Sequence, residues 1–161
     1  MKKILSSTRK VRFQDCDPFN HLNNAKYLDY FINAREDQLL DDYGLDVFGM
    51  MGSQKLSWVV SSQQIGYFRP ATAMESIGIE TQLISFDSRN LVVEMRMYDE
   101  SKTRLKALLW TRFSHFNLAL QRSAEHSEEL TELFREVLLP VEQSDFEARR
   151  AYISQQKKEA K

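Results

Sequence analysis

The sequence has little cysteine and little net charge, and it has no long apolar run. One cysteine cannot form an internal disulfide framework. The 22 basic residues are balanced by 23 acidic ones, which argues against a broad nucleic-acid or anionic-membrane surface. The sequence contains no apolar run of 18 residues, so no membrane span is predicted. The first residues become polar at Ser6, which is too early for the apolar segment of a signal peptide. We therefore expect a cytoplasmic protein without nucleic-acid or membrane partners.

The three histidines and the cysteine are scattered, without the spacing of zinc ligands, so we expect no metal and no cofactor. With 161 residues, 42% of them apolar, the chain is long enough for one domain with a substantial core. No internal repeat or linker divides it. We expect residues 1–122 to form the main domain and residues 123–161 a C-terminal helical extension that packs on it or projects from it.

The first part of the chain predicts a strand and a long helix. Residues 8–13 alternate polar and apolar side chains, as a half-buried strand does. Asn23 or Asn24 can cap the first turn of the helix, and Gly44 can end it in a left-handed conformation. Apolar residues wrap around more than one face of residues 25–43, so we expect a helix that is buried on several sides.

From residue 56 the apolar side chains recur with a period of two. Their parity changes across Ser61-Ser62-Gln63-Gln64, which predicts a bulge or a bend. Further strands are predicted near residues 77–83, 91–97 and 105–117, separated by turns. The order of elements favours an α+β fold in which a curved antiparallel sheet wraps the helix and a free edge invites a second copy.

Two helices are predicted at the end of the chain. Ser127 can cap the first, which begins with two glutamates, and Pro140 ends it. Ser144 and Glu147 fit a capping box for a final charged helix that runs through Tyr152 and frays after Ile153.

The polar loop before the long helix carries the candidate site. Asp17, His21 and Asn24 are crowded where the helix begins. A carboxylate there can act as a base or a nucleophile, and the free N–H groups of a helix N-terminus can stabilise an oxyanion. Each residue also has a structural interpretation. Asp17 before Pro18 can open a turn, His21 can orient the loop, and Asn24 can serve as a cap.

Other polar residues are assigned structural roles. Asp15 is interpreted as a hydrogen-bonding partner of the loop. Cys16 lies between two carboxylates that raise the pKa of its thiol, which disfavours a nucleophile. His115 is expected in the wall of a strand, and His126 in the tail is given no role. Five aromatic residues line either an acyl pocket or the core: Trp58, Tyr67, Phe68, Trp110 and Phe113.

The stretch from Asp15-Cys16-Asp17-Pro18 through residues 21–28 to Ala34-Arg35 resembles the signature of hotdog-fold acyl-CoA thioesterases of the 4-hydroxybenzoyl-CoA thioesterase type. Residues 65–70 and the strand pattern to residue 117 match the same family, so the similarity covers roughly residues 10–118. It implies a hotdog fold, a long central helix wrapped by a curved antiparallel five-stranded sheet, assembled as a homodimer or homotetramer. Asn20 stands where the family often has glycine, and asparagine tolerates a left-handed backbone.

The resemblance also implies an activity, the hydrolysis of acyl-CoA or acyl-carrier-protein thioesters without a metal. Asp17 then corresponds to the catalytic carboxylate, and the backbone N–H of Asn24 to the donor that polarises the carbonyl. His21 is the third candidate catalytic residue, since its imidazole can polarise the substrate or water near Asp17. From the residues themselves, Tyr27, Ser61, Ser62 and Arg69 are assigned to substrate binding. A plain β-bulge explains the two serines equally well, and a solvated rim also explains Arg69. Two alternatives remain open: a non-catalytic hotdog module that binds acyl-pantetheine or a protein, and an enoyl-thioester hydratase.

Overall fold

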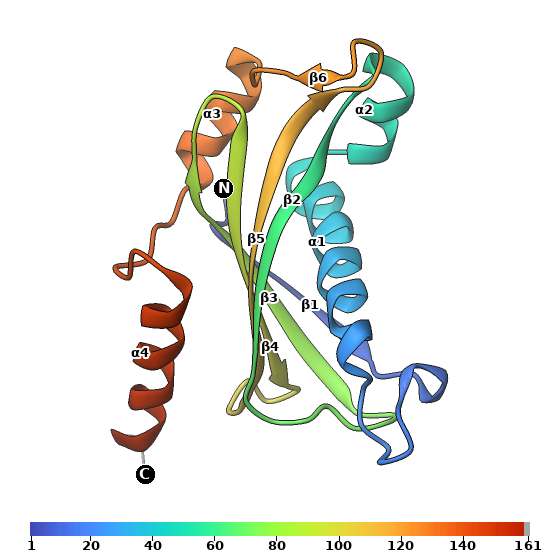
Figure 1. The fold of residues 1–161 in the computed structure, drawn as a ribbon, viewed down its shortest axis with the longest axis vertical. Helices are drawn as coiled ribbons and strands as arrows, with labels where there is room; N and C mark the ends of the chain where they lie inside the picture. Colours follow the sequence, from blue (N-terminus) through green and yellow to red (C-terminus); the bar gives the residue numbers. More distant parts are fainter. Residues whose placement is uncertain (160–161) are drawn as a thin grey trace.

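The computed structural model describes the backbone of residues 1–159 and the side chains of residues 1–156; residues 160–161 of the expected extension lie outside the described residues. Five long strands form one antiparallel sheet in the order β1-β3-β4-β5-β2. Helix α1 (Tyr27–Tyr43) lies along one face, and α4 (Phe146–Glu159) lies on the other side of the sheet (Figure 1). The strands are β1 (Ile4–Lys10), β2 (Leu56–Tyr67), β3 (Ser76–Phe86), β4 (Asn90–Asp99), β5 (Leu105–Asn117) and the short β6 (Arg122–Ser123), which pairs with β5. The expected α+β class is confirmed.

Helix α1 buries one face against the sheet. Its buried apolar side chains are Tyr27, Phe31 and Ala34, and they pack with residues of β3, β4 and β5. On the opposite side Leu40 is 52% exposed. The expectation that this helix is buried on several sides is therefore wrong for the single chain, because the sheet covers one face and leaves the other open.

Both ends of α1 form as their sequences predict. The chain enters through a 3₁₀ turn (Asn24–Lys26), and Asn23 Oδ1 accepts a hydrogen bond of 3.0 Å from the N–H of Ala25, which confirms the cap. At the other end Gly44 has a φ of 63°, and its N–H donates to the carbonyl of Leu40. This left-handed position is one that glycine adopts at low cost.

Gly44→Ala is expected to lower the free energy of unfolding by about 1 kcal/mol, because a β-carbon is disfavoured at a left-handed φ. Among the described residues no atom lies within 4 Å of an added β-carbon at either Gly44 or Gly52, so the φ angle distinguishes the two sites. Gly52→Ala, inside helix α2 (Val47–Gln54), is the matched control and is expected to stabilise. Urea denaturation of both variants measures the difference. Destabilisation of equal size at both sites would contradict this account.

The strands agree with the predicted pattern in most places. The register of β2 against β5 shifts between Val60 and Ser62, which confirms the irregularity predicted from the change in parity. The first strand was placed wrongly: it begins at Ile4 and ends at Lys10, and the chain turns into a short 3₁₀ helix (Phe13–Asp15). Helix α2 and strand β6 were not predicted. Two glycines interrupt the helical pattern of α2, and β6 is too short to show a period.

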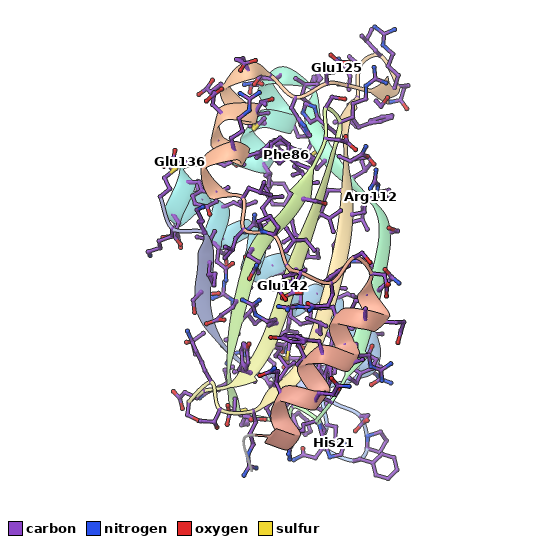
Figure 2. The ribbon with its side chains drawn as sticks, turned by 90° about the vertical axis from the view of Figure 1, so that its left-hand side faces the viewer. His21, Phe86, Arg112, Glu125, Glu136 and Glu142 are labelled. Carbon is purple, nitrogen blue, oxygen red and sulfur yellow. The ribbon has the colours of Figure 1, made fainter. Side chains whose placement is uncertain are left out.

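The C-terminal segment covers both the core and the outer face of the sheet (Figure 2). Helix α3 (Glu128–Val137) is capped by Ser127, as predicted, and its buried side chains belong to the same core as α1. The following chain bonds to β3 beyond the end of β1, where the N–H of Leu139 donates to the carbonyl of Leu83. Helix α4 is capped by Asp145, which accepts from the N–H of Ala148, and not by Ser144 as predicted. It also continues past Ile153 to Glu159.

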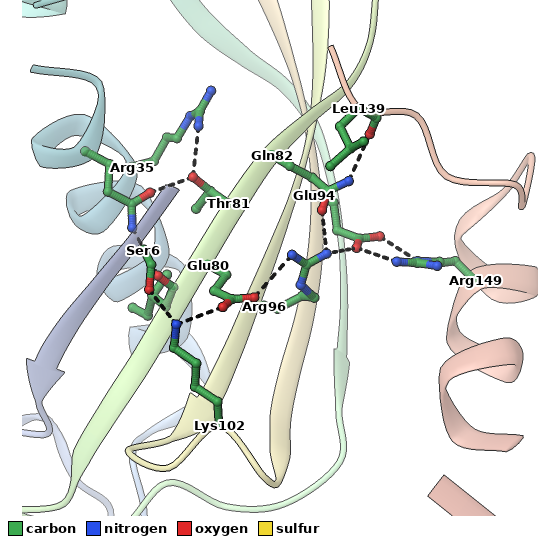
Figure 3. A network of polar contacts seen from close by, with 12 residues as sticks. Ser6, Arg35, Glu80, Thr81, Gln82, Glu94, Arg96, Lys102, Leu139 and Arg149 are labelled. Carbon is green, nitrogen blue, oxygen red and sulfur yellow. Dashed lines mark hydrogen bonds and ion pairs between the residues drawn. The ribbon is translucent and has the colours of Figure 1, made fainter. Parts of the chain in front are cut away.

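A buried carboxylate joins α4 to the outer face of the sheet (Figure 3). Glu94 on β4 has no exposed surface. It accepts two hydrogen bonds of 2.9 Å from Arg149 on α4, one of 2.6 Å from Arg96 and one of 2.8 Å from Trp110 Nε1. Phe146 packs against the ring of Trp110 beside this network. Helix α4 is therefore attached to the sheet through its first turn.

Candidate functional site

The carboxylate of Asp17 is held in a fixed orientation by the backbone of its own loop. Its Oδ1 accepts hydrogen bonds from the N–H of Phe19 at 2.9 Å and of His21 at 3.1 Å. Asn20 has a φ of 64°, so the left-handed turn expected there is present. Among the described residues Oδ2 has no partner. One oxygen thus anchors the half-buried side chain and the other remains available.

The start of α1 offers one unused backbone donor. The side-chain and backbone oxygens of Asn23 accept from the N–H groups of Ala25 and Lys26. In the part of the chain that the structure describes, no acceptor faces the N–H of Asn24. This N–H lies at the positive end of the helix dipole, where an anionic oxygen is stabilised. The sequence predicted this donor, and the cap leaves it free.

The site loop is clamped to the segment that follows β2. The N–H of Leu22 donates to the carbonyl of Ala71 at 2.7 Å, and His21 forms a bridge with Thr72. Tyr27, assigned above to substrate binding, is 2% exposed, and its hydroxyl accepts from the N–H of Ala71. Its ring packs edge-on against Tyr67, with centroids 5.1 Å apart. Tyr27 therefore supports the loop from inside the core and has almost no surface with which to contact a substrate.

The segment after β2, residues 70–75, is held by an ion pair that was not predicted from the sequence. Lys106 is 8% exposed, and its Nζ donates to the carbonyl of Pro70 at 2.9 Å and pairs with Glu75 at 2.8 Å. Glu75 in turn accepts from the N–H and the hydroxyl of Thr72. Burial raises the pKa of Glu75, but the hydrogen bonds from Lys106 and Thr72 outweigh it, so the pKa is below its ordinary value. A lysine followed by the apolar run Ala107-Leu108-Leu109 was the available signal.

Asp15 and Cys16, the two residues before Asp17, have the structural roles expected for them. Asp15 accepts a hydrogen bond of 2.7 Å from the hydroxyl of Tyr30, which itself accepts from the N–H of Arg12. The pKa of Cys16 is raised, first by burial and then by the charges of Asp15 and Asp17. Cys16 is therefore kept as a thiol, which is a weak nucleophile.

The remaining predicted site residues divide between two places. His21 lies at the end of the molecule with the site loop (Figure 2), and exposed Arg69 follows the nearby end of β2. Ser61 and Ser62 lie at the bulge in β2, roughly 17 to 20 Å from Tyr67 along the strand at about 3.3 Å per residue. Ser61 donates to the carbonyl of Arg112. Within one chain the structure does not bring these serines to Asp17.

The aromatic residues also separate. Trp58 and Phe113 line a cavity of about 230 Å³ between α1 and the sheet, near the C-terminal half of the helix. Trp110 lies on the outer face against Phe146, and Tyr67 lies at the start of α1. The expectation that His126 has no role is wrong, because its Nε2 lies 3.1 Å from Trp58 Nε1, which donates to it.

Together, Asp17 and the N–H of Asn24 belong to the loop that leads into the N-terminal end of α1. A carboxylate with a free oxygen can attack a carbonyl or take a proton from water, and an unpaired N–H can stabilise the oxygen that becomes negative. Among the described residues no three His, Cys, Asp or Glu side chains are grouped as metal ligands, and no helix is both long and apolar enough to cross a membrane.

Comparison with known proteins adds a family to this geometry. Residues 11–134 match the thioesterase-like superfamily, a span that extends past residue 118 into α3. The chain is 27% identical over 129 residues to the long-chain acyl-CoA thioesterase FadM of Escherichia coli strain K12, covering 80% of this chain and 96% of that protein.

The solved structures that are similar to this one include one from Escherichia coli and one from Staphylococcus aureus. The first is the probable thioesterase YbaW of Escherichia coli, with 26% identity and a TM-score of 0.71 over 84% of this chain and 99% of that one. The second is the protein SAV2348 of Staphylococcus aureus in complex with CoA, with a TM-score of 0.77 over 90% of this chain and 92% of that one. Its identity of 14% shows the fold alone. The hotdog fold expected from the sequence is confirmed.

Proposed function

Because this chain belongs to the thioesterase-like superfamily, we propose that it is a thioester hydrolase that cleaves acyl-CoA to a free acid and CoA. The observation that carries the proposal is the pairing of an oriented carboxylate, Asp17, with the unused N–H of Asn24 at the start of α1. Thioester hydrolysis requires these two groups, one to deliver the nucleophile and one to stabilise the oxyanion.

In the proposed reaction the thioester carbonyl oxygen accepts a hydrogen bond from the N–H of Asn24. Asp17 Oδ2 either takes a proton from water, which attacks the carbonyl carbon, or attacks that carbon itself, followed by hydrolysis of the anhydride. In both routes the carbon–sulfur bond breaks and the thiolate of CoA takes up a proton. His21, which is half-buried, lies in the same loop as Asp17, and its imidazole can polarise the attacking water. Arg69 follows the end of β2, and its guanidinium can bind a phosphate of CoA.

The acyl group is proposed to be a long aliphatic chain. FadM, 27% identical to this chain, is named for long-chain substrates. Release of free thiol from short, long and aromatic acyl-CoAs, and from acyl-carrier protein, tests the proposal. Long-chain acyl-CoA is expected to be hydrolysed fastest. Tight acyl-CoA binding without thiol release from any thioester would favour the binding module instead, and hydration of crotonyl-CoA would favour the hydratase.

We further propose that two copies pair through β2, which is an edge strand of the sheet. Val59 and Val60 on this strand are 43% and 48% exposed, and Phe48 on the adjacent α2 is 61% exposed. An exposed apolar edge strand favours pairing with an identical strand, which would also bring Ser61 and Ser62 close to a second chain. Light scattering on the purified protein is expected to give a dimer or a tetramer.

Lys106→Met is expected to reduce kcat for acyl-CoA hydrolysis by roughly 10- to 100-fold, because small displacements of catalytic groups have effects of that size. The ion pair of Lys106 with Glu75 holds residues 70–72, and these hold the loop that carries Asp17. Lys106→Arg should restore part of the rate. Lys102→Met, which removes an exposed lysine paired with Glu80, is the control and should leave kcat unchanged. An unchanged kcat in Lys106→Met would contradict the positioning role.

A further inference from the structure

Helix α1 carries a buried arginine that has no acidic partner. Arg35 is 7% exposed, and among the described side chains no carboxylate forms an ion pair with it. Its Nη1 donates a hydrogen bond of 2.9 Å to Thr81 Oγ1 (Figure 3). Within the described part of the chain its Nε and Nη2 have no acceptor, and neither atom is fully buried, so both are accessible to a ligand. Arg35 differs in this respect from buried Arg96, which pairs with Glu94.

The hydrogen bond from the guanidinium of Arg35 to Thr81 is part of a larger network of side-chain hydrogen bonds. Thr81 donates its hydroxyl proton to Gln38 Oε1 at 2.6 Å, so its oxygen is turned to accept from Arg35. Gln38 is fixed in turn by hydrogen bonds to Ser7 and to the carbonyl of Ile79. The guanidinium is thereby oriented, and its remaining N–H groups are directed away from this network.

Arg35 lines the cavity of about 230 Å³ between α1, α2, α3 and the sheet. An apolar cavity of about 150 Å³ is large enough to bind benzene, so this one can hold a longer aliphatic group. The other ionisable lining groups are Glu36, which is half-buried, and Tyr43, whose hydroxyl donates to the carbonyl of Lys2. The rest of the lining is mainly apolar and includes Ile32, Leu39, Trp58, Phe113, Phe134 and Val137.

A charge in such a site is costly. Burial lowers the pKa of Arg35 to about 10, so the guanidinium remains protonated at neutral pH. A guanidinium that is largely removed from water is stabilised by an opposite charge. No described carboxylate forms an ion pair with Arg35, although Glu36 lines the same cavity. Guanidinium groups bind carboxylates through two parallel hydrogen bonds. An anionic group on a ligand is the partner that this arrangement lacks.

We propose that the cavity binds an aliphatic carboxylate, with its chain among the apolar lining residues and its carboxylate on Arg35. The site is separate from Asp17: at 1.5 Å per residue, Arg35 lies roughly 16 Å along α1 from Asn24. The carboxylate has two possible sources, a free fatty acid or the far end of an acyl chain that also carries a thioester. The inference concerns binding and does not depend on the proposed hydrolysis.

Calorimetric titration of the full chain with sodium octanoate and with 1-octanol tests the charge preference. We expect octanoate to bind at least tenfold more tightly than the alcohol of equal length. Arg35→Met removes the charge, keeps a long apolar side chain and should bind the two ligands equally. Arg135→Met, which removes an exposed arginine on α3 that pairs with Glu128, controls for the change in net charge and should keep the preference.

Since Arg35→Met breaks no ion pair, we expect it to fold with an unchanged or higher Tm. If it does not fold, the wild-type chain still decides the matter. Equal affinities for octanoate and octanol, or no binding of either, would overturn the proposal, as would a preference that survives in folded Arg35→Met. Hydrolysis of hexadecanedioyl-CoA and of palmitoyl-CoA separates the two sources of the carboxylate. A lower KM for hexadecanedioyl-CoA would show that the ligand is the far end of an acyl chain. Equal KM values, together with binding of octanoate, would show that the ligand is a free fatty acid.

Discussion

Asp17→Asn is expected to lower the rate of acyl-CoA hydrolysis by roughly 100- to 10,000-fold, the range over which a general base contributes. The amide oxygen of asparagine can still accept from the N–H groups of Phe19 and His21, so the loop should keep its shape. The free oxygen, Oδ2, is replaced by a neutral amide that can neither take a proton nor attack a carbonyl. Thiol release at saturating acyl-CoA measures the loss, and circular dichroism checks the fold.

The matched control is Asp15→Asn, two residues earlier in the same loop. Asp15 accepts from the hydroxyl of Tyr30, and an asparagine oxygen can accept the same bond. We expect this variant to keep hydrolysis within a few-fold of the wild-type rate. If Asp17→Asn hydrolysed acyl-CoA as fast as Asp15→Asn, the assignment of Asp17 as the catalytic carboxylate would be wrong.

Glu94→Gln is expected to lower the free energy of unfolding by about 3–5 kcal/mol, as does the loss of one member of a buried ion pair. The substitution keeps the shape of the side chain but removes the charge that faces Arg96 and Arg149. Two largely buried guanidinium groups then lose their counter-charge. Urea denaturation measures the change, and exposed Glu125→Gln, whose partner Arg89 is also exposed, should have little effect.

The same residue predicts how stability depends on pH. Burial raises the pKa of Glu94, but hydrogen bonds from Arg149 and Trp110 and the charges of both arginines outweigh it, so the pKa lies below its ordinary value. A carboxyl with a depressed pKa stabilises the folded state above its unfolded pKa, near 4.3, and this stabilisation is lost as the pH falls through the folded pKa. Wild type should therefore lose stability faster than Glu94→Gln below about pH 4. Parallel pH curves for the two proteins would exclude this role.

Local sequence predicted those elements whose signals are themselves local. Asn23 caps the first turn before α1, Gly44 ends the helix at a positive φ, and Ser127 caps α3. The bulge in β2 followed from the change in parity at Ser61. Each of these features depends on hydrogen bonds or backbone angles within a few residues, which the order of side chains specifies directly.

Features that depend on distant partners were missed or misplaced. The buried ion pair of Lys106 with Glu75 joins positions far apart in the sequence, and no local pattern indicated their contact. One local feature was also misplaced, because the cap of α4 was assigned to Ser144, although Asp145 forms it. The environment of Arg35 is seen only in the tertiary structure, where it is buried beside Thr81 and no described carboxylate forms an ion pair with it.

The amino-acid sequence by itself determined the α+β class, the helix with its polar loop at residues 15–24, and the family resemblance. Such properties follow from periodicity and short-range hydrogen bonding. Tertiary structure alone decided that Lys106 of β5 and the 68–75 segment brace the site, and that α4 lies on the outer face through Glu94. Both features depend on which surfaces become buried against each other when the chain folds. Packing between residues that are distant in the sequence determines this, and no local pattern specifies it.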